Sequence, residues 1–204
     1  SYWFITPKIT YSLTHYNDIK HARAEIDKSS TRSLPIYSLD TGLIFERNST
    51  VFGRETEQTL EPRLFYAYIP YRNQRHMPNF DSSSADLNFA ELFTPNKYTG
   101  FDRIANTNQL SAVLTTRYID SGTGKEWFSA TVGQRYYFTD EKVDLYWSNP
   151  GKTKNRSDVL AASQFSLFEG WRLEGAIQYS TEWSRISKTS AGIRYNPRDF
   201  STVA

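Results

Sequence analysis

The sequence predicts an all-β protein: a slice of roughly eight strands from a larger antiparallel, up-and-down transmembrane β-barrel. Three observations lead to this prediction. Apolar and polar residues alternate with a period of two along most of the chain, which is the pattern of strands with two unlike faces. The alternating runs are about ten residues long, whereas strands of soluble sheets usually have about five or six. Short polar turns and long loops follow each other alternately, as in barrels that cross a membrane.

Three strands are expected in the first third of the chain. Residues 3–14 carry apolar or aromatic side chains at the odd positions and mostly polar ones at the even positions. Residues 35–46 and 60–68 alternate in a similar way. The expected connections are a long polar loop at residues 17–33 and a shorter link at residues 48–57.

The third expected strand leads into the longest connection of the chain. Its apolar face opposes Glu61 and Arg63, and Pro62 predicts weakened pairing or a bulge because proline cannot donate to the ladder. The following loop, residues 73–105, carries more aromatic and aliphatic side chains than a loop in water would. We therefore expect this loop to contact a partner protein or the barrel interior. Asp102 and Arg103 are expected to anchor it by a charge-assisted hydrogen bond.

The second half of the chain repeats the pattern. Polar turns with glycine are expected at residues 120–125 and 168–171, and a second long loop at residues 139–157. The strand with the most regular alternation opens at Trp171 and is expected to continue to Trp183. The other strands expected in this half cover residues 110–118, 128–138, 159–167 and, incompletely, 191–195.

The alternation also assigns polar side chains to the inside of the barrel. A period of two puts one set of charged and amide residues on the face opposite the apolar one. Inside a barrel such a face lines the lumen, where a polar or amphiphilic passenger can follow it. The residues assigned to the lumen are Glu61, Arg63, Arg117, Arg135, Arg172, Glu174 and Gln178.

Composition narrows the classes of function. The 204 residues include 24 basic and 22 acidic side chains, a net charge of +2, so no nucleic-acid partner is expected. The absence of cysteine excludes disulfides and thiolate chemistry within this stretch. The first residues lack the features of a signal peptide, and no run reaches the length of a transmembrane helix. The chain begins and ends in the middle of its pattern, which indicates part of a longer protein.

No catalytic or metal-binding signature is present, so we expect neither an enzyme nor a cofactor. Asp40-Thr41-Gly42 and Asp120-Ser121-Gly122 resemble the paired triplets of aspartic proteases. They are interpreted instead as one lumen carboxylate and one turn residue. The histidines lie far apart in the sequence, without metal-ligand spacing.

Several segments together resemble one family. The segments that carry this resemblance are TLEPRLFYAYIPYRNQ, PNFDS, FDRIANTNQLSAVLTTRYID and GQRYYF, with FERN, EGW and AIQY elsewhere. Through them the chain strongly resembles the barrel domain of the LptD family, the lipopolysaccharide-assembly proteins of Gram-negative outer membranes. The likeness covers most of the chain. It implies an outer-membrane barrel of roughly 26 strands, with residues 1–204 as a central portion and no second domain. The implied function is insertion of lipopolysaccharide into the outer leaflet.

The resemblance also implies partners. In this family a periplasmic jellyroll domain, which this stretch lacks, receives lipopolysaccharide from transport-bridge proteins. The lipoprotein LptE plugs the barrel, outer-membrane lipid surrounds it, and the glycolipid leaves between the first and last strands, which are also missing here. By analogy the loop at residues 73–105 folds inward onto the plug. The residues assigned to this contact are Phe80, Asp81, Leu87, Phe89, Phe93, Tyr98, Asp102 and Arg103.

Three alternatives remain open at this point. A soluble β-sandwich also shows alternation, although its strands are usually shorter. A passive porin-like channel shares the whole pattern and predicts ion conductance without a partner. An outer-membrane hydrolase with carboxylates at the loop ends predicts turnover that is lost with one carboxylate.

Overall fold

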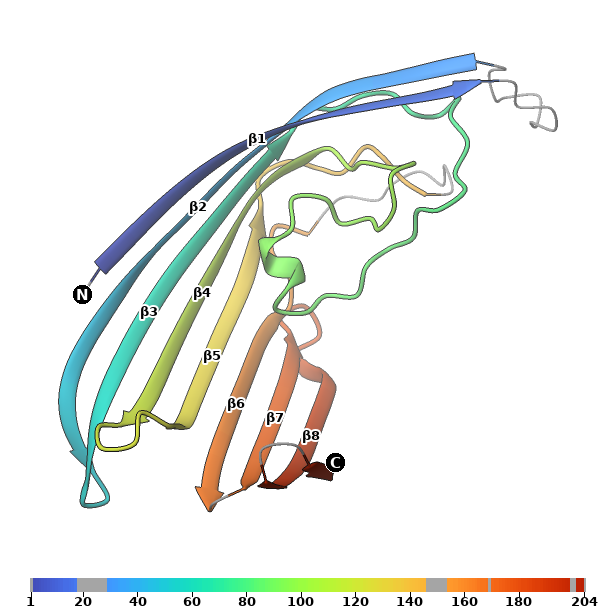
Figure 1. Cartoon of the computed structure of the whole chain (residues 1–204). Coiled ribbons are helices and arrows are strands. Elements are labelled where there is room, and N and C mark those ends of the chain that lie inside the picture. Colours follow the sequence, from blue (N-terminus) through green and yellow to red (C-terminus); the bar gives the residue numbers. More distant parts are fainter. Residues whose placement is uncertain (1, 18–28, 146–153, 169, 199–200, 204) are drawn as a thin grey trace.

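The computed structural model describes residues 2–17, 29–145, 154–168, 170–198 and 201–203, which form one curved antiparallel sheet (Figure 1). Nine strands lie in sequence order, each hydrogen-bonded to the next, and eight of them have ten or more residues. This architecture confirms the predicted all-β, up-and-down fold. The strands are β1 (Tyr2–Asn17), β2 (Ser29–Val51), β3 (Arg54–Ile69), β4 (Thr107–Asp120), β5 (Glu126–Tyr137), β6 (Val159–Phe168), β7 (Trp171–Ser180), β8 (Arg185–Arg198) and β9 (Ser201–Val203).

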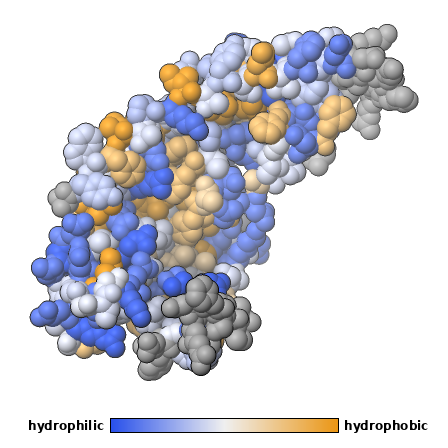
Figure 2. Space-filling view, in the orientation of Figure 1, coloured by the Kyte–Doolittle hydropathy of each residue, from blue (hydrophilic) through white to orange (hydrophobic). Residues whose placement is uncertain are grey.

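One face of the sheet is apolar and open. The cross-strand partners Leu114, Val132, Ala161 and Ile177 form one row on it. The sheet bows away from its long loops, so this face is convex (Figure 1), and hydrophobic side chains project along its outline (Figure 2). Leu114, Val132 and Ile177 are each more than two-fifths exposed. A wide exposed apolar face of this kind suits contact with lipid rather than water.

Aromatic residues border the convex face at two levels. Tyr118 pairs with Phe128 near the short turns, and Tyr136 pairs with Leu110 nearer the long loops. The row of Leu114 lies midway, four residues along β4 from Tyr118 (118 − 114) and four from Leu110 (114 − 110). At about 3.3 Å per residue the two levels are about 26 Å apart along the strands. This matches the apolar band of about 25 Å that membrane barrels show.

The opposite, concave face combines charged side chains with small and buried ones. Arg63, Val113, Gly133, Leu160 and Gln178 form a continuous row across five neighbouring strands. Along this row the structure buries Val113, Gly133 and Leu160. The long loops lie over this face in Figure 1.

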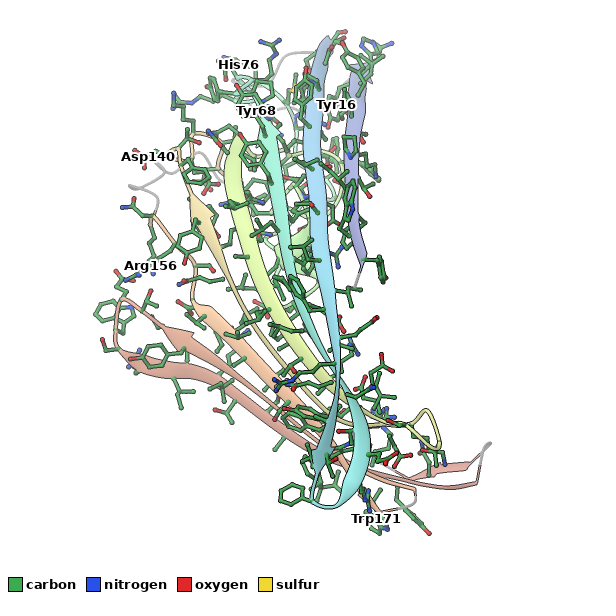
Figure 3. All side chains as sticks on the ribbon, turned by 90° about the vertical axis from the view of Figure 1, so that its left-hand side faces the viewer. Tyr16, Tyr68, His76, Asp140, Arg156 and Trp171 are labelled. Carbon is green, nitrogen blue, oxygen red and sulfur yellow. The ribbon has the colours of Figure 1, made fainter. Side chains whose placement is uncertain are left out.

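The long loops gather at one end of the sheet and the short turns at the other. Figure 3 places His76, Asp140 and Arg156 at the loop end and Trp171 at the opposite end. The connection from β3 to β4, here called the β3–β4 loop, comprises residues 70–106 and contains the 3-10 helix η1 (Glu91–Phe93). The second long loop is described at residues 138–145 and 154–158.

The loop between β1 and β2 is shorter than the predicted range of residues 17–33. β1 continues to Asn17 and β2 begins at Ser29, with Tyr16 paired to Ser30, while residues 18–28 lie outside the described part. The segment from Ser29 to Ser33 is polar on both faces of the strand. Alternation therefore vanishes although the ladder continues, and the sequence pattern could not show the extension.

The link predicted at residues 48–57 is also wrong, because most of it is strand. β2 runs to Val51 and β3 starts at Arg54, so only Phe52 and Gly53 form the turn. Their φ angles, 50° and 75°, are both positive, as a two-residue type I′ hairpin requires. The flanking residues are mostly polar on both faces, which again hides the strand from a search for alternation.

The strand predicted from Trp171 to Trp183 ends earlier, at Ser180, and Trp183 lies in the turn that follows. β8 correspondingly begins at Arg185 rather than near residue 191. The register of the β7–β8 ladder shifts between Gln178 and Tyr179. Such a bulge breaks the period of two, so alternation could not locate the start of β8.

The irregularity expected at Pro62 is present on one side of β3. The β2–β3 ladder runs to the pair Gly42–Arg63 and resumes at Phe45–Leu60. On the other side Pro62 pairs with Leu114 in unbroken register. The weaker pairing predicted from the missing N–H is therefore confirmed for the edge that faces β2.

Candidate functional site

The charged side chains of the concave face are joined in two groups. Arg63 donates to both carboxylate oxygens of Asp40, at 2.8 and 2.5 Å. Arg117 lies 3.0 Å from Glu61 and 2.8 Å from Glu126. All five side chains are between 22% and 41% exposed, so each pair contributes at most about 1 kcal/mol to stability. Their main effect is to keep this wall polar and wet.

Arg63 also contacts the β3–β4 loop. Its guanidinium carbon lies 3.9 Å from the ring centroid of Phe93, and the Phe93 ring meets that of Phe65 edge-on at 6.1 Å. A cation over an aromatic face contributes about 0.5–2 kcal/mol. Phe93 is therefore held against the wall by a cation and by a second aromatic ring.

Leu92, in the middle of η1, is the most deeply seated loop side chain. It is 0% exposed and packs with Val113 and Leu160 of the concave row, while Leu87, Phe89 and Phe93 surround this cluster. Gly133 provides the space, because a Cβ at that position would lie 2.7 Å from Leu92 Cδ1. The sheet thus offers a recess at Gly133 into which the loop fits.

We expect Gly133→Val to displace η1 in the full-length protein, at a cost of about 1–3 kcal/mol for overpacking. Gly175→Val is the matched control on β7, since a Cβ there meets only the carbonyl oxygen of Ser190, at 3.8 Å. The measurement is hydrogen exchange at residues 88–94. Faster exchange in the Gly133 variant alone is the expected result, and equal exchange in both variants would contradict the recess.

Arg135 binds backbone carbonyls at both ends of η1. Its guanidinium donates to the backbone carbonyls of Glu91 and Thr94, and its Nε donates to Ser111 Oγ at 3.2 Å. Gln109 also donates to the Thr94 carbonyl, at 3.1 Å. The Glu91 carbonyl already accepts from the N–H and the hydroxyl of Thr94, so Arg135 adds a further donor there. Thr94 is the C-cap of η1, and its carbonyl accepts from both Arg135 and Gln109. Two concave-face residues therefore fix the loop at its centre.

Arg32 of β2 holds the base of the loop. It is 2% exposed and donates to the carbonyls of Phe101 and Asp102, at 2.5 and 2.6 Å. It also donates to Gln74 Oε1 and Thr14 Oγ1, each at 2.9 Å. A single buried guanidinium thus links the β1–β2 hairpin to both ends of the β3–β4 loop.

Gln74 and Arg103 extend this network within the loop. The amide of Gln74 exchanges hydrogen bonds with the backbone of Ile104, at 2.7 and 3.2 Å. Arg103, 1% exposed, donates to the carbonyls of Met77 and Pro78 at 2.7 and 2.8 Å. The two ends of the β3–β4 loop are therefore joined by side-chain hydrogen bonds rather than by the backbone hydrogen bonds of a β-ladder.

Two carboxylates complete the base. Asp102 accepts from Tyr16 Oη at 2.5 Å and from the N–H groups of Phe80 and Asp81. Asp81 accepts from the N–H groups of Phe101 and Asp102, each at 3.1 Å. Although desolvation acts in the opposite direction, these hydrogen bonds lower the pKa of Asp81. The arrangement leaves Phe80 and Phe101 outside, 75% and 77% exposed.

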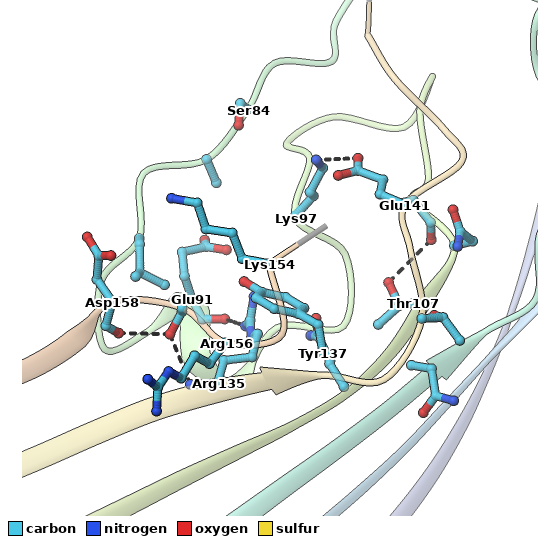
Figure 4. Close-up of a pocket in the computed structure, with 18 of the residues that line it drawn as sticks. Ser84, Glu91, Lys97, Thr107, Arg135, Tyr137, Glu141, Lys154, Arg156 and Asp158 are labelled. Atoms are coloured by element: carbon cyan, nitrogen blue, oxygen red, sulfur yellow. Dashed lines mark hydrogen bonds and ion pairs between the residues drawn. The ribbon is translucent and has the colours of Figure 1, made fainter. Parts of the chain in front are cut away.

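A cleft of about 610 Å³ lies between the two long loops and the ends of β4 and β5 (Figure 4). Lys97 pairs with Glu141 at its rim. Tyr98 Oη lies 2.6 Å from the Glu141 carboxylate and 2.8 Å from the Val143 carbonyl. Burial and that carboxylate raise the pKa of Tyr98, so the phenol stays protonated. Arg156 and Asp158 also line the cleft, so its lining combines hydrogen-bond donors and acceptors.

The predicted lumen residues share one face but do not form one cluster. Glu61, Arg63, Arg117 and Arg135 lie on β3 to β5, where they border or contact the β3–β4 loop. The three on β7 lie farther along the face. Gln178 donates to Asp158 at 2.7 Å, Glu174 lies 3.7 Å from Arg194, and Arg172 is exposed.

All of the predicted loop residues except Phe80 fall into three groups. Leu87, Phe89 and Phe93 pack on the concave wall, and Tyr98 packs with Ala105 and Val143 in a second cluster. The charged set Asp81, Asp102 and Arg103 joins the loop base, so the predicted anchoring role of Asp102 and Arg103 agrees with their hydrogen bonds. Phe80 points outward instead.

Sequence reasoning missed Arg32, Gln74, Tyr16, Leu92 and Gly133. Arg32 lay in a segment assigned to a polar loop, where arginine is ordinary. Gln74 carries no local signal at all. The period of two puts Gly133 on the polar face of its strand, and a glycine inside a strand is a recognisable sign of close approach by another group.

The two aspartate triplets are not brought together. Asp40 pairs with Phe65 and Asp120 with Thr56 on the same strand, nine residues apart (65 − 56), or about 30 Å. The Asp120 carboxylate accepts from the N–H and the hydroxyl of Thr123, at 2.8 and 2.9 Å. Asp120 is thus a turn residue, and the two carboxylates are too far apart to share a proton.

Among the described residues, no cluster of His, Asp or Glu side chains could hold a metal ion. The same residues include no helix of the length and apolar character that a membrane span needs.

Comparison with known proteins identifies the family. The family model described as LPS transport system D, LptD, matches residues 1–204. The chain belongs to the LptD family. It is similar to the LPS-assembly protein LptD of Paraburkholderia xenovorans, with 42% identity over 200 residues, covering 96% of this chain and 25% of that protein. The LPS-assembly protein LptD of Aromatoleum aromaticum is 44% identical over 195 residues, covering 96% and 24%.

A third relative, the LPS-assembly protein LptD of Thiobacillus denitrificans, is 39% identical over 196 residues, covering 96% of this chain and 26% of that protein. The chain thus spans about a quarter of the length of the curated relatives that it matches. LptD family membership agrees with a sheet that is apolar on its convex face and charged on its concave face.

Proposed function

We propose that this chain is part of the barrel wall of an outer-membrane translocon that inserts lipopolysaccharide into the outer leaflet of a Gram-negative bacterium. The match to LPS transport system D along all 204 residues carries this proposal. The two faces of the sheet support it, because an amphiphile needs a polar interior route and the wall needs an apolar exterior. No enzymatic step is part of the proposal.

The proposed partners are lipopolysaccharide, surrounding lipid, the plug lipoprotein LptE and, through an N-terminal domain, the periplasmic transport-bridge proteins. The β3–β4 loop supports a role for the plug. Its inner side chains, Leu87, Phe89 and Phe93, are used in packing against the wall. Phe80 and Phe101 remain exposed on a loop base that the Asp81 and Asp102 carboxylates fix. A rigid pair of exposed aromatic rings is suited to contact with a protein partner.

The test uses the full-length protein in cells whose own copy can be switched off. The combined substitutions Phe89→Ser and Phe93→Ser remove apolar contacts between the β3–β4 loop and the concave face. We therefore expect several-fold less newly made lipopolysaccharide at the cell surface. Phe52→Ser is the control, since Phe52 is 91% exposed in the β2–β3 turn. Normal surface delivery by the double variant would contradict a role for the loop.

A second arm separates the plug contact from loop seating. Phe80→Ser combined with Phe101→Ser leaves the seat intact and should lower the amount of plug lipoprotein that co-purifies. A porin-like function predicts instead steady ion conductance by the purified full-length protein with no partner present. That result, together with unchanged co-purification, would favour the passive channel.

A further inference from the structure

The convex face carries a hollow that the barrel wall itself does not require. It is an open depression of about 600 Å³ across β3 to β8, a volume within the range of small-molecule sites. Large and small side chains of the apolar face line it. Those that define its shape are Leu60, Leu114, Ala130, Val132, Ala161 and Ile177.

The hollow arises because small residues occupy the middle of neighbouring strands. One cross-strand row contains Ala130, Ser163, Gly175 and Ala191. Ala161 occupies the adjacent row, between Val132 and Ile177. Larger side chains rise around this floor, on β3 and β4 from one side and on β7 from the other. The result is a groove with apolar walls across the strands.

The lining contains no ionisable residue, and its polar members are hydroxyls of Ser and Thr. Charged or strongly polar ligands would lose their hydration here without a partner. The groove is also continuous with the row of Leu114, Val132 and Ile177, which forms the open apolar face. The occupant that suits it is therefore a flexible hydrocarbon chain.

An aromatic cluster lies next to the groove on the side of the short turns, where Tyr118, Phe128 and Phe165 lie two residues along their strands from Thr116, Ala130 and Ser163. Tyr118, Trp127, Phe128 and Phe165 have ring centroids 5.5 to 6.2 Å apart. A register shift between Tyr118 and Ile119 admits Trp127 as an additional residue opposite β4. Trp and Tyr collect at the level of lipid headgroups. The groove thus lies between that level and mid-membrane, in the leaflet on the short-turn side.

We propose that this groove, called here the acyl groove, seats an acyl chain of a glycerophospholipid from the leaflet on the short-turn side. The inference rests on the proposed membrane setting of the convex face. It adds a lipid site at a defined place on the outer wall, away from the interior route. An acyl chain bound in the groove fills a depression into which the chains of the surrounding lipids would otherwise have to bend.

The experiment uses the full-length protein in vesicles containing a phospholipid with a photoactivatable acyl chain. A second set of vesicles carries the same group on a lipid A-type glycolipid. We expect the phospholipid probe to mark Leu114, Val132 and Ile177 several times more, relative to their exposure, than Ile5 and Ile9. The latter are convex-face residues outside the groove, 55% and 73% exposed.

Filling the groove gives the matched comparison. Ala161→Phe should reduce this labelling several-fold, and Gly175→Leu should do the same from the next row if the first variant fails to assemble. Ile5→Phe enlarges the convex face elsewhere and should change nothing. Labelling in proportion to exposure, equal labelling by the glycolipid, or cross-links to a second copy of the protein would each overturn the acyl groove. A convex face that no lipid probe reaches would instead contradict the proposed membrane setting.

Discussion

Arg32→Ala in the full-length protein is expected to release the β3–β4 loop from the concave face. The side chain is 2% exposed and donates to two loop carbonyls and to Gln74. Its removal leaves those acceptors without their donor and takes away one of the two cations beside the Asp102 carboxylate. Breaking a buried charged network of this kind costs about 3–5 kcal/mol, which corresponds to a hundredfold or greater rise in local opening, at about tenfold per 1.4 kcal/mol.

Hydrogen exchange at residues 70–106 measures this opening directly. Arg47→Ala is the control on the same strand, because Arg47 is exposed and makes one side-chain hydrogen bond, to Gln58 at 2.7 Å. Its loss should cost less than about 1 kcal/mol. If the Arg32 variant protects the loop from hydrogen exchange as well as the unaltered protein does, the contacts of η1 with the concave face are sufficient to hold the loop.

Arginine at position 177 and arginine at position 178 are expected to have opposite outcomes. Ile177 belongs to the row midway between the two aromatic levels of the convex face, where a lipid-facing arginine costs about 2–4 kcal/mol. Gln178 lies on the concave face, 2.7 Å from the Asp158 carboxylate, which an arginine can also pair with. Ile177→Arg should therefore lower the heat stability of the assembled barrel strongly, and Gln178→Arg only slightly.

The thermal shift of the folded, full-length barrel in detergent or vesicles gives the comparison. Because the two positions are neighbours in one strand, they share backbone environment and distance from the turns. Equal loss for both substitutions would mean that the two faces are not in different surroundings. Tolerance of both would place Ile177 in water.

Strand identity and facing could be predicted from the sequence because burial on one face alone imposes the period of two. The period of two puts Leu114, Val132 and Ile177 on the apolar face of their strands and Arg63 and Gln178 on the polar face, in agreement with the register of the sheet. It failed wherever both faces are polar, as from Ser29 to Ser33, and wherever a bulge shifts the pattern, as beyond Gln178.

The composition of the β3–β4 loop indicated that it is packed, yet the means of packing could not be read from it. The loop contacts of Arg32, Gln74 and Gly133 join residues that lie 30 positions (Gln74 to Ile104) to 70 positions (Arg32 to Asp102) apart, and none of the three stands in a local motif. Phe80 shows the converse difficulty. Its type suggests burial like that of Phe89 and Phe93, but the turn fixed by Asp81 and Asp102 directs it outward.

The central claim is that the two faces of one sheet meet lipid and water respectively. The most direct test places an environment-sensitive fluorescent residue at position 177 or 178 of the full-length protein in vesicles. A lipid-soluble quencher should reduce emission from 177 and leave 178 unaffected, and a water-soluble quencher should do the reverse. Quenching of both positions by the water-soluble reagent alone would contradict the membrane-spanning sheet and, with it, the proposed place of this chain in a lipopolysaccharide translocon.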